Sequence, residues 1–142
     1  MTPLDLTKAP PRPPQKELRG LCMLPRMIDI ARAMLSGGTI GKYQIGRGVS
    51  GAVLSAFGIS AAEFVDIVRN ASSDDDVAQR MWSLRAVPAA ALSRRLRSLT
   101  AADVPDDLRP EFERFYGSEH PSDRLVFDIL EADDARAFKN KT

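Results

Sequence analysis

Apolar residues recur every three or four positions along most of the chain after residue 20, a spacing that predicts amphipathic α-helices. The clearest repeat falls in residues 21–35. One side of that predicted helix carries the apolar residues Leu24, Met27, Ile28, Ala31 and Leu35. Pro25 stands in the first turn, where its missing amide hydrogen has no partner to lose. Because the apolar arc covers about 160° of the circumference, we expect a central helix enclosed by at least two others.

The opposite arc of this helix carries Arg26, Asp29 and Arg32 at intervals of three residues. Side chains at that interval are neighbours on adjacent turns, which predicts a carboxylate lying between two guanidinium groups. The row has two interpretations. It is either an ion-pair ladder that satisfies a polar seam, or a pair of arginines held ready for a carboxylate or phosphate.

Two capping boxes mark helix starts in the rest of the chain. Ser60 with Glu63, and Thr100 with Asp103, place a hydroxyl and a carboxylate where each satisfies a backbone amide of the other residue. Amphipathic repeats follow both boxes, and residues 125–130 favour a helix over a short strand. Residues 15–19 predict a short helical turn.

These elements predict a mainly α fold, a compact orthogonal bundle of several helices with a glycine-rich loop. The length of 142 residues suits one domain with a substantial core. We assign residues 16–142 to a single helical domain and residues 1–15 to an extended proline-rich arm. Prolines at positions 10, 11, 13 and 14 favour polyproline II. The arm either lies along the domain or is a ligand for a small domain with an aromatic groove.

Six of the nine glycines lie in residues 37–51, and Gly46, Gly48 and Gly51 form a G-x-G-x-x-G pattern. A dinucleotide site needs a strand before this pattern and a parallel strand beyond it, and residues 43–45 are short and polar for a central strand. The partner motifs of a kinase or a P-loop are also missing. We interpret the segment as a flexible or tightly turned structural loop. A plain anion site from Lys42, Arg47 and the amides of the next helix is the alternative.

The formal net charge of +1 argues against a protein that binds nucleic acid through phosphate contacts. Two short helices beginning near residues 73 and 88, the second of them basic, have the spacing of a helix-turn-helix. However, Asp74, Asp75 and Asp76 would repel phosphate. Charge is uneven along the chain, with 8 Lys and Arg against 3 Asp and Glu in residues 1–60, and 12 against 16 thereafter. This polarity is a surface feature, or it lets two molecules or an anion associate.

Cys22 is the single cysteine, so no internal disulfide forms, and its apolar surroundings predict a buried thiol. The chain has no apolar run of 18 residues and no secretory signal, so we expect a cytoplasmic protein. His120 is the single histidine and has no second ligand nearby, so we expect no metal site. Nothing in the sequence calls for a cofactor.

The segment Leu24-Pro25-Arg26-Met27-Ile28-Asp29 followed by Ala31-Arg32-Ala33, together with the upstream prolines and Tyr43, resembles an uncharacterised bacterial family. Its members are small, mostly helical cytoplasmic proteins with a domain of unknown function. The resemblance is clear over residues 5–72 and faint beyond Trp82. It implies a fold and an origin but no reaction. Residues 48–51 differ from the family pattern, which has a Cys-Pro-Leu-Asp-like stretch there.

Two functional hypotheses remain open. The first is an interaction or regulatory module without catalysis, with an unknown protein partner or a second copy of the chain. The second is a small enzyme or a domain that binds an anionic or phosphate ligand. Its site would combine the arginine–aspartate row with the glycine-rich loop, through the residues Arg26, Asp29, Arg32, Lys42, Tyr43 and Arg47.

Overall fold

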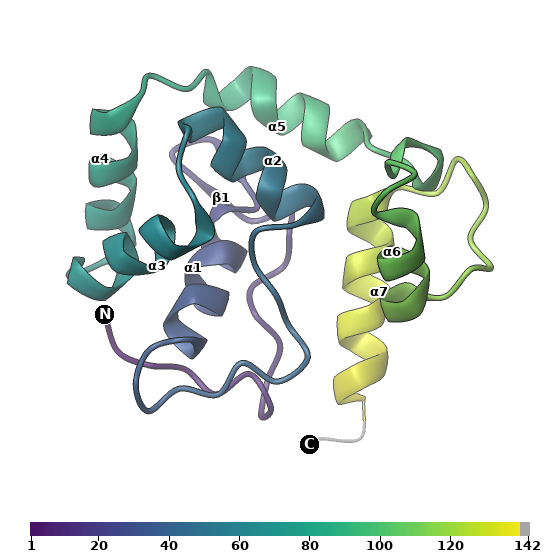
Figure 1. Cartoon of the computed structure of the whole chain (residues 1–142), viewed down its shortest axis with the longest axis horizontal. Helices are drawn as coiled ribbons and strands as arrows, with labels where there is room; N and C mark the ends of the chain where they lie inside the picture. Colours follow the sequence, from purple (N-terminus) through teal and green to yellow (C-terminus); the bar gives the residue numbers. More distant parts are fainter. Residues whose placement is uncertain (140–142) are drawn as a thin grey trace.

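The computed structural model describes residues 1–139 and confirms the mainly α fold (Figure 1). A two-stranded antiparallel hairpin precedes seven α-helices and one 3₁₀ turn within these residues. The elements are β1 (Glu17–Leu18), β2 (Leu21–Cys22), α1 (Leu24–Ala33), α2 (Gly48–Phe57), α3 (Ala61–Asn70), α4 (Asp74–Leu84), α5 (Ala89–Ser98), η1 (Ala101–Asp103), α6 (Arg109–Tyr116) and α7 (Val126–Phe138).

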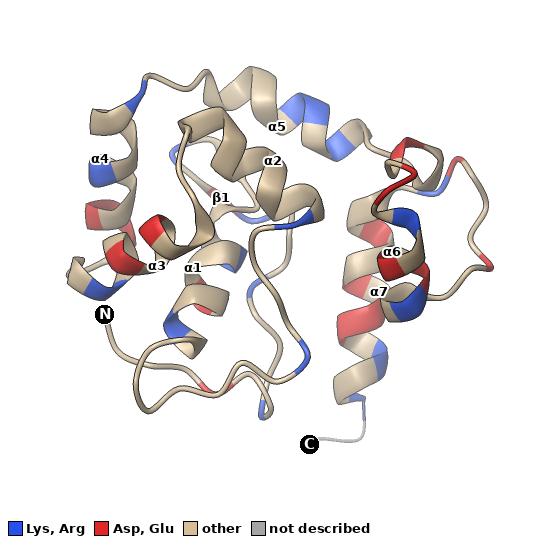
Figure 2. Ribbon diagram, viewed as in Figure 1, with Lys and Arg blue, Asp and Glu red and all other residues tan. Residues whose placement is uncertain are grey.

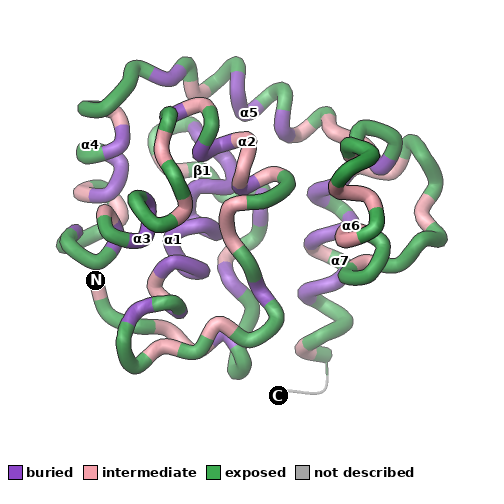
Figure 3. Tube along the Cα trace, viewed as in Figure 1, coloured by how far each residue is buried: buried purple, intermediate pink, exposed green. Residues whose placement is uncertain are grey.

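Helix α1 is the buried centre of the fold, as its wide apolar arc predicts (Figure 3). Nine of its ten residues are buried. It packs against α3 and the hairpin, and Leu24, Met27 and Ile28 are completely inaccessible to solvent. Burying a side chain of this size stabilises the fold by about 2 kcal/mol, so the helix is a large part of the core.

The helix begins three residues later than the sequence predicts. Residues 17–22 form the hairpin, and the helical turn predicted at residues 15–19 is wrong. Arg19 and Gly20 make the tight turn with φ angles of 52° and 78°, values that a helix excludes. Ser93 of α5 then ties the hairpin down, because its hydroxyl donates to the Gly20 carbonyl at 2.7 Å and accepts from the Cys22 amide at 3.0 Å.

Helix α3 packs against α1, α4 packs against α3 and β1, and α5 packs against β2. The predicted start signals occur, although the one at Thr100 opens the 3₁₀ turn η1 and not an α-helix. The capping boxes at Ser60 and at Thr100 are both present. Trp82 on α4 packs edge-on against Phe57 of α2, with ring centroids 5.0 Å apart, and its indole donates to a backbone carbonyl. The predicted buried thiol of Cys22 is confirmed, and burial raises its pKa.

Helices α6 and α7 lie side by side at one end of the molecule and follow α5 through η1 (Figure 1). The helix predicted over residues 125–130 is confirmed, and its cap residue Leu125 forms a β-bridge with Thr100. Helix α7 buries one face, whereas α6 contains no buried residue. The two helices therefore differ in how firmly apolar packing holds them.

The first fourteen residues lie against the helical body. Leu6, Pro11 and Pro14 are buried, and the terminal amine of Met1 donates to the Ala71 carbonyl at 2.8 Å. Arg12 is the strongest attachment. Its amide donates to Asp29 at 2.8 Å, and its guanidinium pairs with Asp29 at 3.0 Å and with Asp74 at 2.7 Å.

Within residues 1–139, none of the helices is long and apolar enough to cross a membrane by itself. Taken together, α2 and α3 have the length and the apolar composition of a membrane span, but they meet at a bend of 76°.

The contacts of Asp29 predict the effect of removing its carboxylate. We expect Asp29→Ala to lower the free energy of unfolding by about 2 kcal/mol, between the values typical of exposed and buried pairs, because Arg12 keeps its second partner Asp74. Urea unfolding followed by circular dichroism measures this change. The matched control Asp66→Ala removes a largely exposed ion pair on α3 and is expected to cost about 0.5 kcal/mol or less. Equal losses for the two variants would contradict the prediction.

Candidate functional site

A cavity of about 340 Å³ lies between α6 and α7 on one side and α1, α2 and α5 on the other. Its volume is in the range of small-molecule sites. Most of its wall is apolar, and the larger apolar side chains belong to Met23, Ile30, Leu99, Leu108, Phe112 and Leu130. Charged side chains from α1, the loop before α2, α5, η1, α6 and α7 complete it.

The buried Arg26–Asp134 ion pair joins α1 to α7 at this cavity. The guanidinium donates to both carboxylate oxygens, at 2.7 and 3.2 Å, and the two side chains are 3% and 11% exposed. The Tyr43 hydroxyl donates to the same carboxylate at 2.8 Å, while the Arg26 guanidinium lies 5.5 Å from the Tyr43 ring centre. No fully buried side-chain nitrogen or oxygen of this cluster lacks a hydrogen-bond partner, as burial requires.

A second ion pair lies beside the first. Lys42 of the glycine-rich segment pairs with Asp133, which also accepts from Arg136 at 2.7 Å. Asp133 is buried like its neighbour Asp134. Figure 2 shows several acidic positions on α7. The C-terminal helix is thus attached to the N-terminal half by opposite charges.

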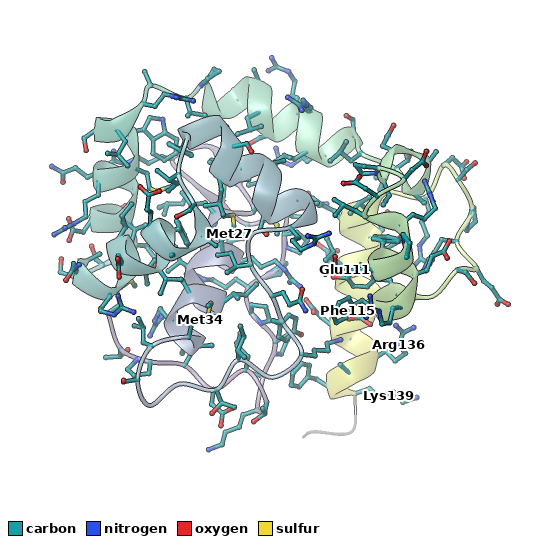
Figure 4. The ribbon with its side chains drawn as sticks, in the orientation of Figure 1. Met27, Met34, Glu111, Phe115, Arg136 and Lys139 are labelled. Carbon is teal, nitrogen blue, oxygen red and sulfur yellow. The ribbon has the colours of Figure 1, made fainter. Side chains whose placement is uncertain are left out.

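A third ion pair lies at the rim of the cavity. Arg47 caps the start of α2 and donates through Nε to Glu111 of α6 at 2.6 Å. The amides of Gly48 and Val49 open α2 beside it and have no hydrogen-bond partner among residues 1–139. Figure 4 shows Glu111 and Phe115 on the side of α6 toward that segment.

Arg95 of α5 is the one lining cation of the described residues that has no ion-pair partner there. It is exposed at the cavity edge. A cation beside an apolar wall attracts an anion with little competition from the protein itself. This position is absent from the set that the sequence predicts.

The structure brings four of the six predicted site residues together and separates the other two. Arg26, Lys42, Tyr43 and Arg47 all line the cavity. Asp29 instead faces the N-terminal arm, where it pairs with Arg12.

The row predicted on α1 is therefore wrong in its pairing. Asp29 does not lie between Arg26 and Arg32, because the arm carries a better-placed guanidinium to it. Arg32 donates to the Thr2 carbonyl at 2.7 Å, and Arg26 turns to α7. The ladder was inferred from one helix alone, and long-range contacts replaced each of its local pairs.

The glycine-rich segment lacks the context of a dinucleotide site. The only sheet in residues 1–139 is the hairpin β1–β2, which lies before this segment and is antiparallel. Gly46 and Gly48 have φ angles of 105° and 63°, a conformation that side chains disfavour. This turn places Arg47 and the first residues of α2 at the edge of the cavity.

The acidic half of the site was not predicted. Asp133, Asp134 and Glu111 lie in helices with ordinary amphipathic patterns, so the sequence predicts a solvated carboxylate at each of these positions. The only available signal was the excess of acidic residues after residue 60 and of basic residues before it. Among residues 1–139, no group of three or more His, Cys, Asp and Glu side chains could hold a metal ion.

Comparison with known families gives one match. The family described as Domain of unknown function (DUF5069) matches residues 8–136, which is most of the chain, and the protein belongs to this family. The match continues well past Trp82, where the resemblance seen in the sequence fades. Comparison with curated proteins finds no match.

Loss of the Asp134 carboxylate is expected to weaken the attachment of α7. Asp134→Ala leaves the buried Arg26 guanidinium without its charged partner, which typically costs about 3–5 kcal/mol. Urea unfolding measures this loss. The matched control Asp128→Ala removes an exposed carboxylate from the first turn of the same helix and is expected to cost about 1 kcal/mol or less. A loss for Asp134→Ala no larger than for the control would contradict a structural role for this pair.

Both tyrosines of the chain line the cavity, which predicts a delayed phenol titration. Burial raises the pKa of Tyr116 to about 12, and burial and the hydrogen bond to Asp134 raise the pKa of Tyr43 further. Because the native state holds both protons more tightly than the unfolded chain, this stabilisation is complete below about pH 10 and is lost as the pH rises toward 12. Absorbance at 295 nm measures tyrosinate. A native midpoint near pH 10 would contradict the burial of both rings.

Proposed function

We propose that this DUF5069 protein is a binding module for a small organic anion with an aromatic or other apolar body, which it holds in the cavity without catalysis. Arg95 is the observation that carries the proposal. It is a cation without a carboxylate partner among the described residues, and it lies at the edge of an apolar cavity of ligand size.

The walls of the cavity favour a ligand with an apolar body. Phe112 and Tyr116 lie with ring centroids 5.0 Å apart, and Leu99 and Leu130 contribute further apolar surface. An aromatic ligand gains both from leaving water and from contact with these rings. The volume of about 340 Å³ accommodates a molecule of one or two rings.

The rim of the cavity favours a ligand with an anionic group. Arg95, Arg47 and the opening residues of α2 all line the cavity, so its edge carries positive charge. Charge-assisted hydrogen bonds from such donors are the strong ones. This edge keeps part of the predicted anion site, namely Arg47 and the helix amides, and adds Arg95.

The carboxylates beside the cavity are held in ion pairs, which favours a role in binding over a role in catalysis. Asp133 and Asp134 are both held by cations. Tyr116 keeps its proton at neutral pH, as tyrosines ordinarily do, and burial raises its pKa further, to about 12. These groups hold the two sides of the cavity together. Occupancy of the cavity would then be the signal of a regulatory module. The bacterial origin in this proposal rests on the sequence resemblance, and the cytoplasmic setting is the one that the sequence analysis predicts.

A small ligand fits the surface better than a large protein partner does. The exposed large hydrophobic residues of the described chain are Met34, Leu84 and Phe115. They lie after α1, on α4 and on α6, so they belong to three separate elements. Docking surfaces usually gather such residues in one patch.

The experiment uses 2-naphthoate as the probe and 2-naphthalenemethanol as its neutral counterpart. We expect naphthoate to shift the backbone amide signals of cavity residues such as Leu99, Phe112 and Leu130 in a heteronuclear NMR titration. The neutral alcohol should bind about tenfold more weakly, because it lacks the charged group. Shifts spread over the whole surface, or no binding of either compound, would overturn the proposal.

Two neighbouring arginines supply a matched test of the rim. Arg95→Ala is expected to weaken naphthoate binding about tenfold, because Arg95 lines the cavity. Arg94→Ala removes the same charge from the adjacent exposed position, which does not line it, and should change the affinity by about twofold or less. Equal effects would show that only the overall charge matters.

A further inference from the structure

The rim pair Arg47–Glu111 connects two segments that apolar packing holds unequally. Arg47 precedes α2, whose face toward the core is buried, whereas Glu111 lies in the first turn of α6, which has no buried residue. The two side chains are 58% and 24% exposed and both line the cavity. An ion pair with this exposure is weak enough to exchange partners.

We infer that the Glu111 carboxylate occupies the place of the ligand's anionic group, so that an incoming carboxylate displaces Glu111 from Arg47. This inference rests on the proposed function and deepens it. It identifies Arg47 as a residue that recognises the anion together with Arg95, Glu111 as an internal competitor, and a carboxylate as the ligand group that best replaces it.

The chemistry of the exchange favours this assignment. The guanidinium keeps one carboxylate partner throughout, so neither state leaves a bare cation at the rim. The other two pairs that join the N-terminal half to α7 are buried on their acidic side, and opening them is costly. Of the three pairs, Arg47–Glu111 is therefore the one that a ligand can replace.

Because of internal competition, the apparent affinity for the ligand equals the intrinsic affinity multiplied by the fraction of molecules in which Arg47 is free of Glu111. A partly exposed pair of this kind is closed in most molecules, but by a small margin. Removing the competitor should therefore raise the affinity about three- to fivefold. A purely structural Glu111 predicts no gain.

The experiment measures naphthoate affinity of the full chain in Glu111→Gln by NMR titration. We expect binding three- to fivefold tighter than in the wild type and unchanged binding of 2-naphthalenemethanol. Glu113→Gln removes the same charge from an exposed position of α6 outside the cavity and should leave the affinity unchanged. The double variant Arg47→Ala with Glu111→Gln should bind no better than Arg47→Ala alone, because the gain depends on Arg47.

Several outcomes overturn the inference. Unchanged or weaker binding by Glu111→Gln would exclude competition. A similar gain in Glu113→Gln, or a gain that persists without Arg47, would show that only the negative charge of the region matters. Each of these results leaves the proposed function standing if naphthoate binds the wild type. A wild type that binds neither probe overturns the proposed function itself.

Discussion

The buried pair between Arg26 and Asp134 is the interaction on which the tertiary arrangement depends. Arg26 extends from a central helix that is enclosed almost all round, so its charge has little access to water. An unpartnered guanidinium in that position would cost several kcal/mol. Asp134 removes this cost and attaches the last helix to the first, 108 residues apart in the chain. Tyr43 then adds a hydrogen bond from the intervening loop.

The uneven distribution of charge along the chain acquires a structural meaning from this arrangement. Three cations from residues 26–47 meet three carboxylates from residues 111–134. The basic first half and the acidic second half therefore complement one another within one molecule. The net charge remains near zero, although the separate halves are strongly charged.

Attachment by polar pairs also explains why a cavity lies at this boundary. Apolar surfaces that pack directly leave few voids, and α1 with its neighbours packs in this way. Helices α6 and α7 instead contact the rest of the molecule partly through ion pairs, whose long side chains keep the two sides apart. The space that remains is lined by apolar side chains and rimmed by charges. Its position makes it sensitive to the same pairs that hold the two sides together.

Sequence alone determined the helical class, the central buried helix and the capping boxes, because these depend on residues within one or two turns of each other. It also predicted a site from residues that include Arg26, Lys42, Tyr43 and Arg47, and these four line one cavity. The late start of α1 was missed because the turn at Arg19 requires a left-handed conformation, which is rare outside glycine.

Only the tertiary structure decided the partners of the charged residues. The spacing of Arg26, Asp29 and Arg32 predicts local pairs, but a pair between adjacent turns at a surface contributes little. Contacts with the arm and with α7 bury Asp29 and Arg26 and so determine the pairing of these two residues. Glu111 and Arg95 also line the cavity, and the sequence does not predict either of them. Their chemistry is ordinary in the sequence, and only the fold brings them to the edge of one cavity.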